Sequence, residues 1–183
     1  MNRKNDLLNL KNSSHNINTN DPALACFLNS LARESRTVQI ESSPQGCTYQ
    51  LPLSGGRSIH IPLGYVSQLG SHEYQLPALL LSSDTVTTLS VHQLIELIVS
   101  EPAIVGFISE DQKQIFMTRV LESQHNTSQG IQHSPYKNRL FTDKLDFKTA
   151  EQGLLIGHSF HPAPKSREQF SLEDARVYSP ELG

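Results

Sequence analysis

A short segment near the C-terminal end of the sequence gathers most of the side chains that could do chemistry. Residues 157–167 read GHSFHPAPKSR. Glycine lets a backbone come close to a ligand, and proline restricts the conformations of a loop. A stiff loop that presents hydrogen-bond donors and positive charge suits an anionic ligand. A charge-assisted hydrogen bond from Lys165 or Arg167 to a phosphate would contribute roughly 1.5–3 kcal/mol.

The same residues permit other interpretations. His158 and His161, at i and i+3, could ligate zinc, but no third or fourth ligand is near, because Cys26 and Cys47 lie far away in the sequence. We therefore predict no metal site. The two histidines could instead hydrogen-bond the loop backbone, and the lysine and arginine could be solvated surface charges. From the residues alone, a ligand-binding loop and a structural loop stand equally open.

The elements that must position this loop are expected to begin at Asp21. Asp21 is a good N-cap, and Pro22 suits the first helical position. Apolar residues then recur with the spacing of one buried helical face. They are Leu24, Phe27, Leu28 and Leu31.

A group of strands is expected next. From Thr37 to Leu63 apolar and polar residues alternate, and turn residues stand at 43–46 and 54–56. This pattern predicts three strands joined by tight turns. A further strand is a candidate over 74–81, where Pro77 would place it at a sheet edge or interrupt it.

The remaining elements are predicted to be helical. Ser90 and Gln93 form a capping box, and Pro102 follows the end of that helix. A longer helix is expected from about 112 to 130, with an unusually polar second half. The apolar residues that should face the core from these two helices are Leu94, Leu97, Ile98, Ile115, Phe116 and Val120.

The last part of the chain alternates loops and short helices. Residues 133–144 are interpreted as a loop, and a shorter helix over 148–156 leads into Gly157 as its C-cap. A final short helix is expected over 171–178. Together these elements predict the α+β class, with helices packed around a small, mainly antiparallel sheet.

Composition bounds the function. The 183 residues suffice for one domain with a core, expected over 21–183 after a flexible tail over 1–20 that contains seven asparagines. A net charge of −3 does not favour nucleic acid. The sequence shows no membrane helix and no signal peptide, so we expect no membrane partner and a cytoplasmic location. Two cysteines are too few for a disulfide framework and are expected to be reduced and half-buried.

Residues 151–181 resemble the most characteristic block of the IucA/IucC family, the NRPS-independent siderophore synthetases. In that block a glutamate precedes GH(P/S)xHPxxKxR, and a short helix then leads to a tyrosine and Pro-Glu. The matching residues here are Glu151, Gly157-His158-Ser159-Phe160-His161-Pro162, Lys165-Ser166-Arg167, Tyr178 and Pro180-Glu181. Ser159 replaces the commoner proline, and Gln169 stands where the family commonly has glycine, which would alter the loop backbone if that glycine adopts an unusual angle.

The resemblance implies the N-terminal, thumb-like portion of an ATP-dependent ligase for siderophore biosynthesis. Such an enzyme adenylates a carboxylate of citrate or a related acid and condenses it with an amine or hydroxyl, using ATP and Mg²⁺, and a homodimer is expected. By resemblance Glu151 supports the loop, and no catalytic residue is assigned. The residues expected at the ATP phosphates are His158, Ser159, His161, Lys165, Ser166 and Arg167.

The resemblance also implies that the family's chain continues well beyond Pro180-Glu181. A protein with one wall of a cleft should not turn over substrate, because catalysis needs the assembled site. We therefore expect a truncated synthetase that is inactive as an isolated chain. A non-catalytic binding module and a remnant of such a synthetase are the alternatives.

Overall fold

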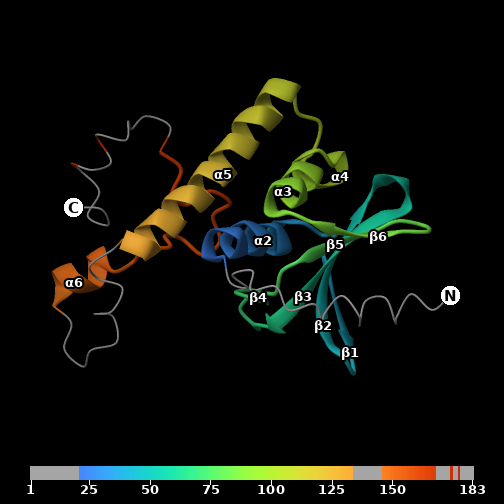
Figure 1. Cartoon of the computed structure of the whole chain (residues 1–183), viewed down its shortest axis with the longest axis horizontal. Coiled ribbons are helices and arrows are strands. Elements are labelled where there is room, and N and C mark those ends of the chain that lie inside the picture. The colour runs from blue at the N-terminus through green and yellow to red at the C-terminus, as the bar shows by residue number, and fades with distance from the viewer. Residues whose placement is uncertain (1–20, 134–145, 168–173, 175–176, 178–183) are drawn as a thin grey trace.

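The computed structural model describes residues 21–133, 146–167, 174 and 177. Within these residues a six-stranded antiparallel sheet lies on one side of the molecule and the helices lie on the other (Figure 1). This arrangement confirms the predicted α+β class. The predicted tail, most of the loop over 133–144 and the predicted final helix over 171–178 lie outside the described residues, apart from residues 133, 174 and 177.

The sheet is built from neighbouring antiparallel strands in the order β1-β2-β3-β5-β6, and β4 pairs with β3. The first three strands are the predicted ones, and they turn at 44–45 and at a short 3-10 segment over 54–56. The strands are β1 (Gln39–Ser43), β2 (Gly46–Leu53), β3 (Arg57–Tyr65), β4 (Glu73–Tyr74), β5 (Ala78–Leu81) and β6 (Val86–Leu89).

Two of the described helices begin where their caps predict. The Asp21 carboxylate accepts hydrogen bonds from the backbone of Ala23 and Leu24, and Ser90 and Gln93 form the predicted capping box. Because these side chains satisfy N–H groups that have no partner within the helix, they fix its first turn. The helices are α2 (Pro22–Glu34), α3 (Val91–Val99), α4 (Pro102–Val105), α5 (Glu110–His133) and α6 (Phe147–Gln152).

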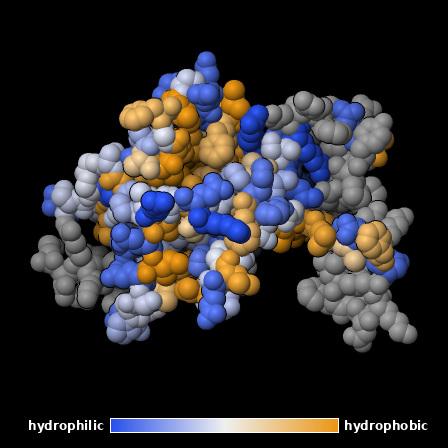
Figure 2. Space-filling model, turned by 180° about the vertical axis from the view of Figure 1, so that it is seen from behind, coloured by the Kyte–Doolittle hydropathy of each residue, from blue (hydrophilic) through white to orange (hydrophobic). Residues whose placement is uncertain are grey.

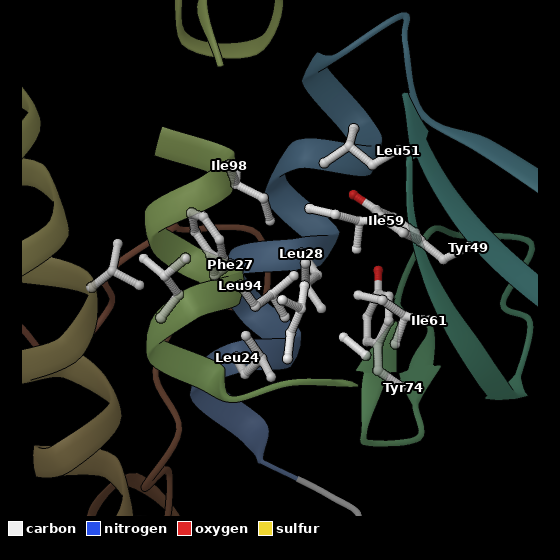
Figure 3. Close-up of a cluster of buried hydrophobic side chains, with 14 of the residues drawn as sticks. Leu24, Phe27, Leu28, Tyr49, Leu51, Ile59, Ile61, Tyr74, Leu94 and Ile98 are labelled. Carbon is white, nitrogen blue, oxygen red and sulfur yellow. The ribbon is translucent and has the colours of Figure 1, made fainter. Parts of the chain in front are cut away.

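The hydrophobic core lies between the sheet and two helices, α2 and α3 (Figure 3). Leu28 of α2 lies near Ile61 of β3, whereas Phe27 lies on the side of α3, and both α2 residues are fully buried together with Ile59 and Ile61. Helix α5 packs on α2 and α3, and the Phe116 ring of α5 lies 6.3 Å from that of Phe27. The molecule is therefore layered as sheet, helix pair and long helix.

Two predictions about apolar faces need correction. Ile115 was expected to anchor α5 in the core, but it is 49% exposed. Val120 is buried and Phe116 is half-buried, so the buried face of α5 begins one residue later than predicted. Ile40, which belongs to the predicted alternation, is also exposed, and it lies in β1, the last strand at one edge of the described sheet.

The segment 74–81 is not one strand. Pro77 interrupts it, since proline has no N–H to give to a ladder, and leaves β4 and β5 on either side. Strand β5 then pairs with both β3 and β6, so it is not an edge. Two elements were not predicted at all: β6, a four-residue strand, and α4, a single turn that starts at Pro102.

The helix predicted over 148–156 is shorter than expected. Helix α6 ends at Gln152, and Gly153, not Gly157, is its C-cap. Leu155 is buried two residues beyond that cap, so the chain leaves the helix to place this side chain inward. Gly157 does adopt the left-handed region, with φ +81°, but within the loop.

The surface is mixed in character. Apolar side chains gather in several patches between hydrophilic residues on the face seen in Figure 2. Both thiols are free, Cys26 being buried and Cys47 half-buried, and burial raises the pKa of Cys26 to about 11. Among the residues that the structure describes, no helix is both long and apolar enough to cross a membrane.

Candidate functional site

The loop 157–167 is anchored to the body of the protein by apolar contacts at its base. Leu155, just before the loop, is buried, and Ala163 within it belongs to the hydrophobic core. Gly157 packs tightly, because a Cβ at this position would lie 3.0 Å from Cβ of Pro164. The glycine of the motif is thus required both by its backbone angle and by its neighbour.

Helix α5 holds the basic end of the loop through its backbone. The backbone N–H of Lys165 donates to Oγ of Ser123 at 3.0 Å, and the carbonyl of Lys165 accepts from Nδ2 of Asn126 at 2.9 Å. Oε2 of Glu122 accepts from Oγ of Ser166 at 3.1 Å and from the backbone N–H of Arg167 at 3.2 Å. We call Glu122, Ser123 and Asn126 the α5 clamp.

The two histidines of the loop each bond to the backbone beside them. Nδ1 of His158 accepts from the N–H of Phe160 at 3.2 Å, and Nδ1 of His161 accepts from the N–H of Ala163 at 3.1 Å. A neutral imidazole that accepts at Nδ1 carries its proton on Nε2. Both side chains are exposed, so each can donate from Nε2 to a ligand while its other nitrogen orders the loop.

Phe160 fixes the tip of the loop against α2. The guanidinium of Arg33, in the last turn of α2, lies 4.9 Å from the centre of the Phe160 ring, which is the geometry of a cation–π contact. The His158 ring packs edge-on at 6.2 Å. The segment around Gly70 also lies against this ring, because a Cβ at Gly70 would lie 3.7 Å from Cε1 of Phe160.

A buried polar network ties the segment around Gly70 to the same helix. Oδ1 of Asn29 accepts from the backbone N–H of His72 at 3.1 Å and from the Tyr74 hydroxyl at 2.9 Å. Nδ1 of His72 accepts from the N–H of Ser67 at 3.2 Å, and burial lowers the pKa of His72. Because these groups are buried, losing a partner would leave a costly unpaired group, so the segment is firmly placed.

The predicted site residues of the loop are neighbours in the chain but differ in how far they are exposed to solvent. His158, Ser159 and His161 are exposed, whereas Lys165, Ser166 and Arg167 are half-buried against α5. Glu151 lies exposed on α6. Its backbone oxygen accepts a hydrogen bond from the N–H of Leu154 at 3.3 Å. Within the described ranges no three His, Cys, Asp or Glu side chains group in a way that could hold a metal.

The sequence did not single out the residues that position the loop. They are Arg33 and the α5 clamp. The available signal was the polarity of the second half of α5, where buried Ser123 and Thr127 replace the apolar residues of an ordinary packed helix. The loop accounts for Ser123, whose hydroxyl accepts from the backbone of Lys165.

Comparisons with known proteins agree on one family. The model of the IucA / IucC family matches residues 146–183. An N(2)-citryl-N(6)-acetyl-N(6)-hydroxylysine synthase of Vibrio mimicus is 65% identical, over 100% of this chain and 31% of the relative. The synthase of the same name from Escherichia coli is 35% identical, over 88% of this chain and 28% of the relative.

A solved structure agrees with the fold. The structure of ATP-bound aerobactin synthetase IucA from a hypervirulent pathotype of Klebsiella pneumoniae superimposes with a TM-score of 0.82 at 33% identity. The match covers 89% of this chain and 29% of that one. The chain thus spans about a third of the length of the relatives that it matches. It therefore matches the IucA/IucC family and superimposes on the N-terminal region of that aerobactin synthetase.

Proposed function

We propose that this region forms one wall of the ATP site of a siderophore synthetase. In the whole protein, the enzyme would adenylate a carboxylate of citrate or a related acid and then transfer the acyl group to an amine or hydroxyl. The observation that carries the proposal is the loop 157–167, whose basic end is held by its backbone against α5. An ATP-bound relative of the same fold, at 33% identity, supports it.

The loop offers an anion two kinds of group. Lys165 and Arg167 supply positive charge, and a guanidinium in particular matches phosphate oxygens with two parallel donors. His158 and His161, bonded through Nδ1, offer neutral Nε2–H donors. Ser159 is exposed beside them, and Ser166 donates its hydroxyl to Glu122 and so contributes through the position of the loop.

The chemistry assigned to this wall is positioning and charge stabilisation. Attack of a carboxylate on the α-phosphorus of ATP places negative charge on the phosphate oxygens, and fixed donors stabilise that charge without reorganising. The loop does not fit Mg²⁺, which prefers oxygen ligands, because its charged side chains are cations. We therefore assign Mg²⁺ no ligand in this loop.

The test is isothermal titration of the chain with ATP and Mg²⁺. The Lys165→Ala/Arg167→Ala variant should lose about 100-fold or more in affinity, since each charge-assisted bond contributes roughly 1.5–3 kcal/mol. The control is Arg36→Ala/Lys113→Ala, which removes the same charge from outside the loop. Equal losses in both variants would mean that only general positive charge attracts ATP.

The same loop is testable in the complete enzyme. Lys165→Ala, placed in a full-length homologue, should reduce adenylation severely, because the lost interaction is with the reacting nucleotide. Pyrophosphate release in the presence of citrate measures that step. Near-normal activity would contradict the assigned role of Lys165.

A further inference from the structure

A carboxylate at the basic end of a loop that we assign to phosphates needs a reason. Glu122 brings negative charge to within hydrogen-bond distance of Ser166 and Arg167. If its effect were only electrostatic, it would repel an anionic ligand and weaken binding. Its position is therefore explained only if Glu122 has a structural role that supports the neighbouring basic residues.

What Glu122 provides is the fixed path of the loop backbone. One of its oxygens, Oε2, accepts from both the Ser166 hydroxyl and the Arg167 N–H. Oγ of Ser123 accepts from the backbone N–H of Lys165, and Nδ2 of Asn126 donates to the carbonyl of Lys165. The α5 clamp thus engages backbone groups of the two residues that carry the basic side chains.

The spacing of the α5 clamp makes it a rigid template. Residues at i, i+1 and i+4 lie on adjoining parts of one helix face, and α5 runs as a helix of 24 residues from Glu110 to His133. Ser123 is 1% exposed, so this face is dry where it meets Lys165. Hydrogen bonds in such surroundings are directional and costly to leave unmade.

We infer that Glu122 is a positioning residue: its carboxylate accepts hydrogen bonds that fix Ser166 and Arg167, so that Arg167 is aimed at the phosphates. Lys165 beside it is held by Ser123 and Asn126. This inference deepens the proposed function and rests on it. It makes the hydrogen-bond acceptor essential and the negative charge dispensable. Those two properties of a carboxylate can be separated by substitution.

The experiment compares three variants by titration with ATP and Mg²⁺. Glu122→Ala removes acceptor and charge, and should lose about tenfold in affinity, as expected for hydrogen bonds that position a charged group. Glu122→Gln removes the same charge but keeps an acceptor oxygen, and should bind as tightly as the native chain or more tightly. Asp111→Asn, in the exposed first turn of α5, makes the same change of charge away from the loop and should bind normally.

A second measurement reports on the loop without any nucleotide. Amide hydrogen exchange should become at least about tenfold faster at Arg167 in Glu122→Ala, while Lys165 stays protected by Ser123. Ser123→Ala should give the reverse pattern. The thermal unfolding temperature of each variant shows whether the whole fold is retained, so that a local change in the loop can be distinguished from global unfolding.

The outcomes separate the inference from the function on which it rests. If the native chain does not bind ATP, the proposed ATP wall fails in this chain, and the exchange pattern still decides whether Glu122 fixes the loop. If the chain binds ATP and Glu122→Ala binds equally well or better, the positioning role is overturned. An equal loss in Glu122→Gln and Glu122→Ala would also overturn it, because the charge would then be the essential property.

Discussion

The sheet with its two covering helices and the loop 157–167 are held in place by different kinds of contact. In the first region, which spans 22–99, apolar side chains from every layer meet in one dry core. In the second, the buried apolar residues are Leu155 and Ala163, and the basic end is fixed by side chains of α5 that bond to its backbone. One region is stable through burial, and the other is precise through directed hydrogen bonds.

This difference separates stability from function. Burial is roughly proportional to area and tolerates some change of shape, whereas a hydrogen bond demands a particular atom at a particular distance. A ligand loop needs the second property more than the first. Substitutions in the two regions should therefore have different consequences, with losses of stability in one and losses of ligand affinity in the other.

The largest expected effect is at the centre of the core. Phe27→Ala should lower the free energy of unfolding by about 3–5 kcal/mol, because it empties a fully buried site between the sheet and α5. Urea denaturation measures the change. Phe107→Ala removes the same ring where it is 98% exposed and should change stability by less than about 0.5 kcal/mol. Similar losses in the two variants would contradict the core described here.

A smaller effect is expected at the base of the loop. Gly157→Ala forces an alanine into the left-handed region, at roughly 1–2 kcal/mol, and adds a contact at 3.0 Å with Pro164. ATP affinity should fall as the loop shifts. Gly55→Ala is the matched control, since Gly55 has φ +71° with no atom within 4 Å of the added Cβ. It should show the backbone cost in denaturation without any change in ATP titration.

The smallest effect concerns a buried carboxylate just beyond the first region, which bonds to a residue within it. Oε2 of Glu101 accepts from the backbone N–H of Ser54 at 2.8 Å and from its hydroxyl at 2.9 Å. The backbone hydrogen bond is the main cause that lowers the pKa of Glu101. Its contribution to stability is therefore complete above the ordinary carboxyl pKa of 4.5 and is lost as pH falls through the lower folded-state pKa.

The variant that tests this is Glu101→Gln. It keeps an acceptor but loses the charge, and should lower the free energy of unfolding by about 1 kcal/mol at neutral pH, because neutral hydrogen bonds are roughly half as strong. Between pH 7 and pH 3 the free energy of unfolding of this variant, measured by denaturation, should then fall less steeply than that of the native chain. Glu34→Gln, on the exposed end of α2, makes the same change of charge away from Ser54 and should change the free energy of unfolding at neutral pH by less than about 0.5 kcal/mol. If the free energy of unfolding of Glu101→Gln depended on pH as steeply as that of the native chain, the stabilising role of the Glu101 carboxylate would be contradicted.

Local rules predicted the first region well. The caps Asp21 and Ser90, the helical stripe around Phe27 and the alternation in β2 and β3 each depend on residues close in sequence. The wrong predictions lie where contacts between residues far apart in the sequence decide the local structure. Strand β6 has four residues, and its exposed threonines do not show the alternation that predicts a strand. Helix α6 ends earlier than predicted because Leu155 must turn into the core.

The loop itself could be identified by its composition and by its resemblance to a family, but its supports could not. Glu122, Ser123 and Asn126 lie about 40 positions from the residues that they hold. A polar stretch of helix reads equally well as a solvated face, and only the packing of the chain shows what it meets. Arg33 was likewise indistinguishable from a surface charge until Phe160 was placed beneath it.

The order of the strands has a consequence for how the protein is made. Most sheet neighbours are also neighbours in the chain, so each pairing closes only a short loop and loses little entropy. Such local topologies form quickly, and the N-terminal segments of a chain leave the ribosome first. The sheet, α2 and α3 are all synthesised by Val99, well before residue 157 exists. The body of the protein can therefore fold ahead of its loop, which then arrives at a surface already prepared to receive it.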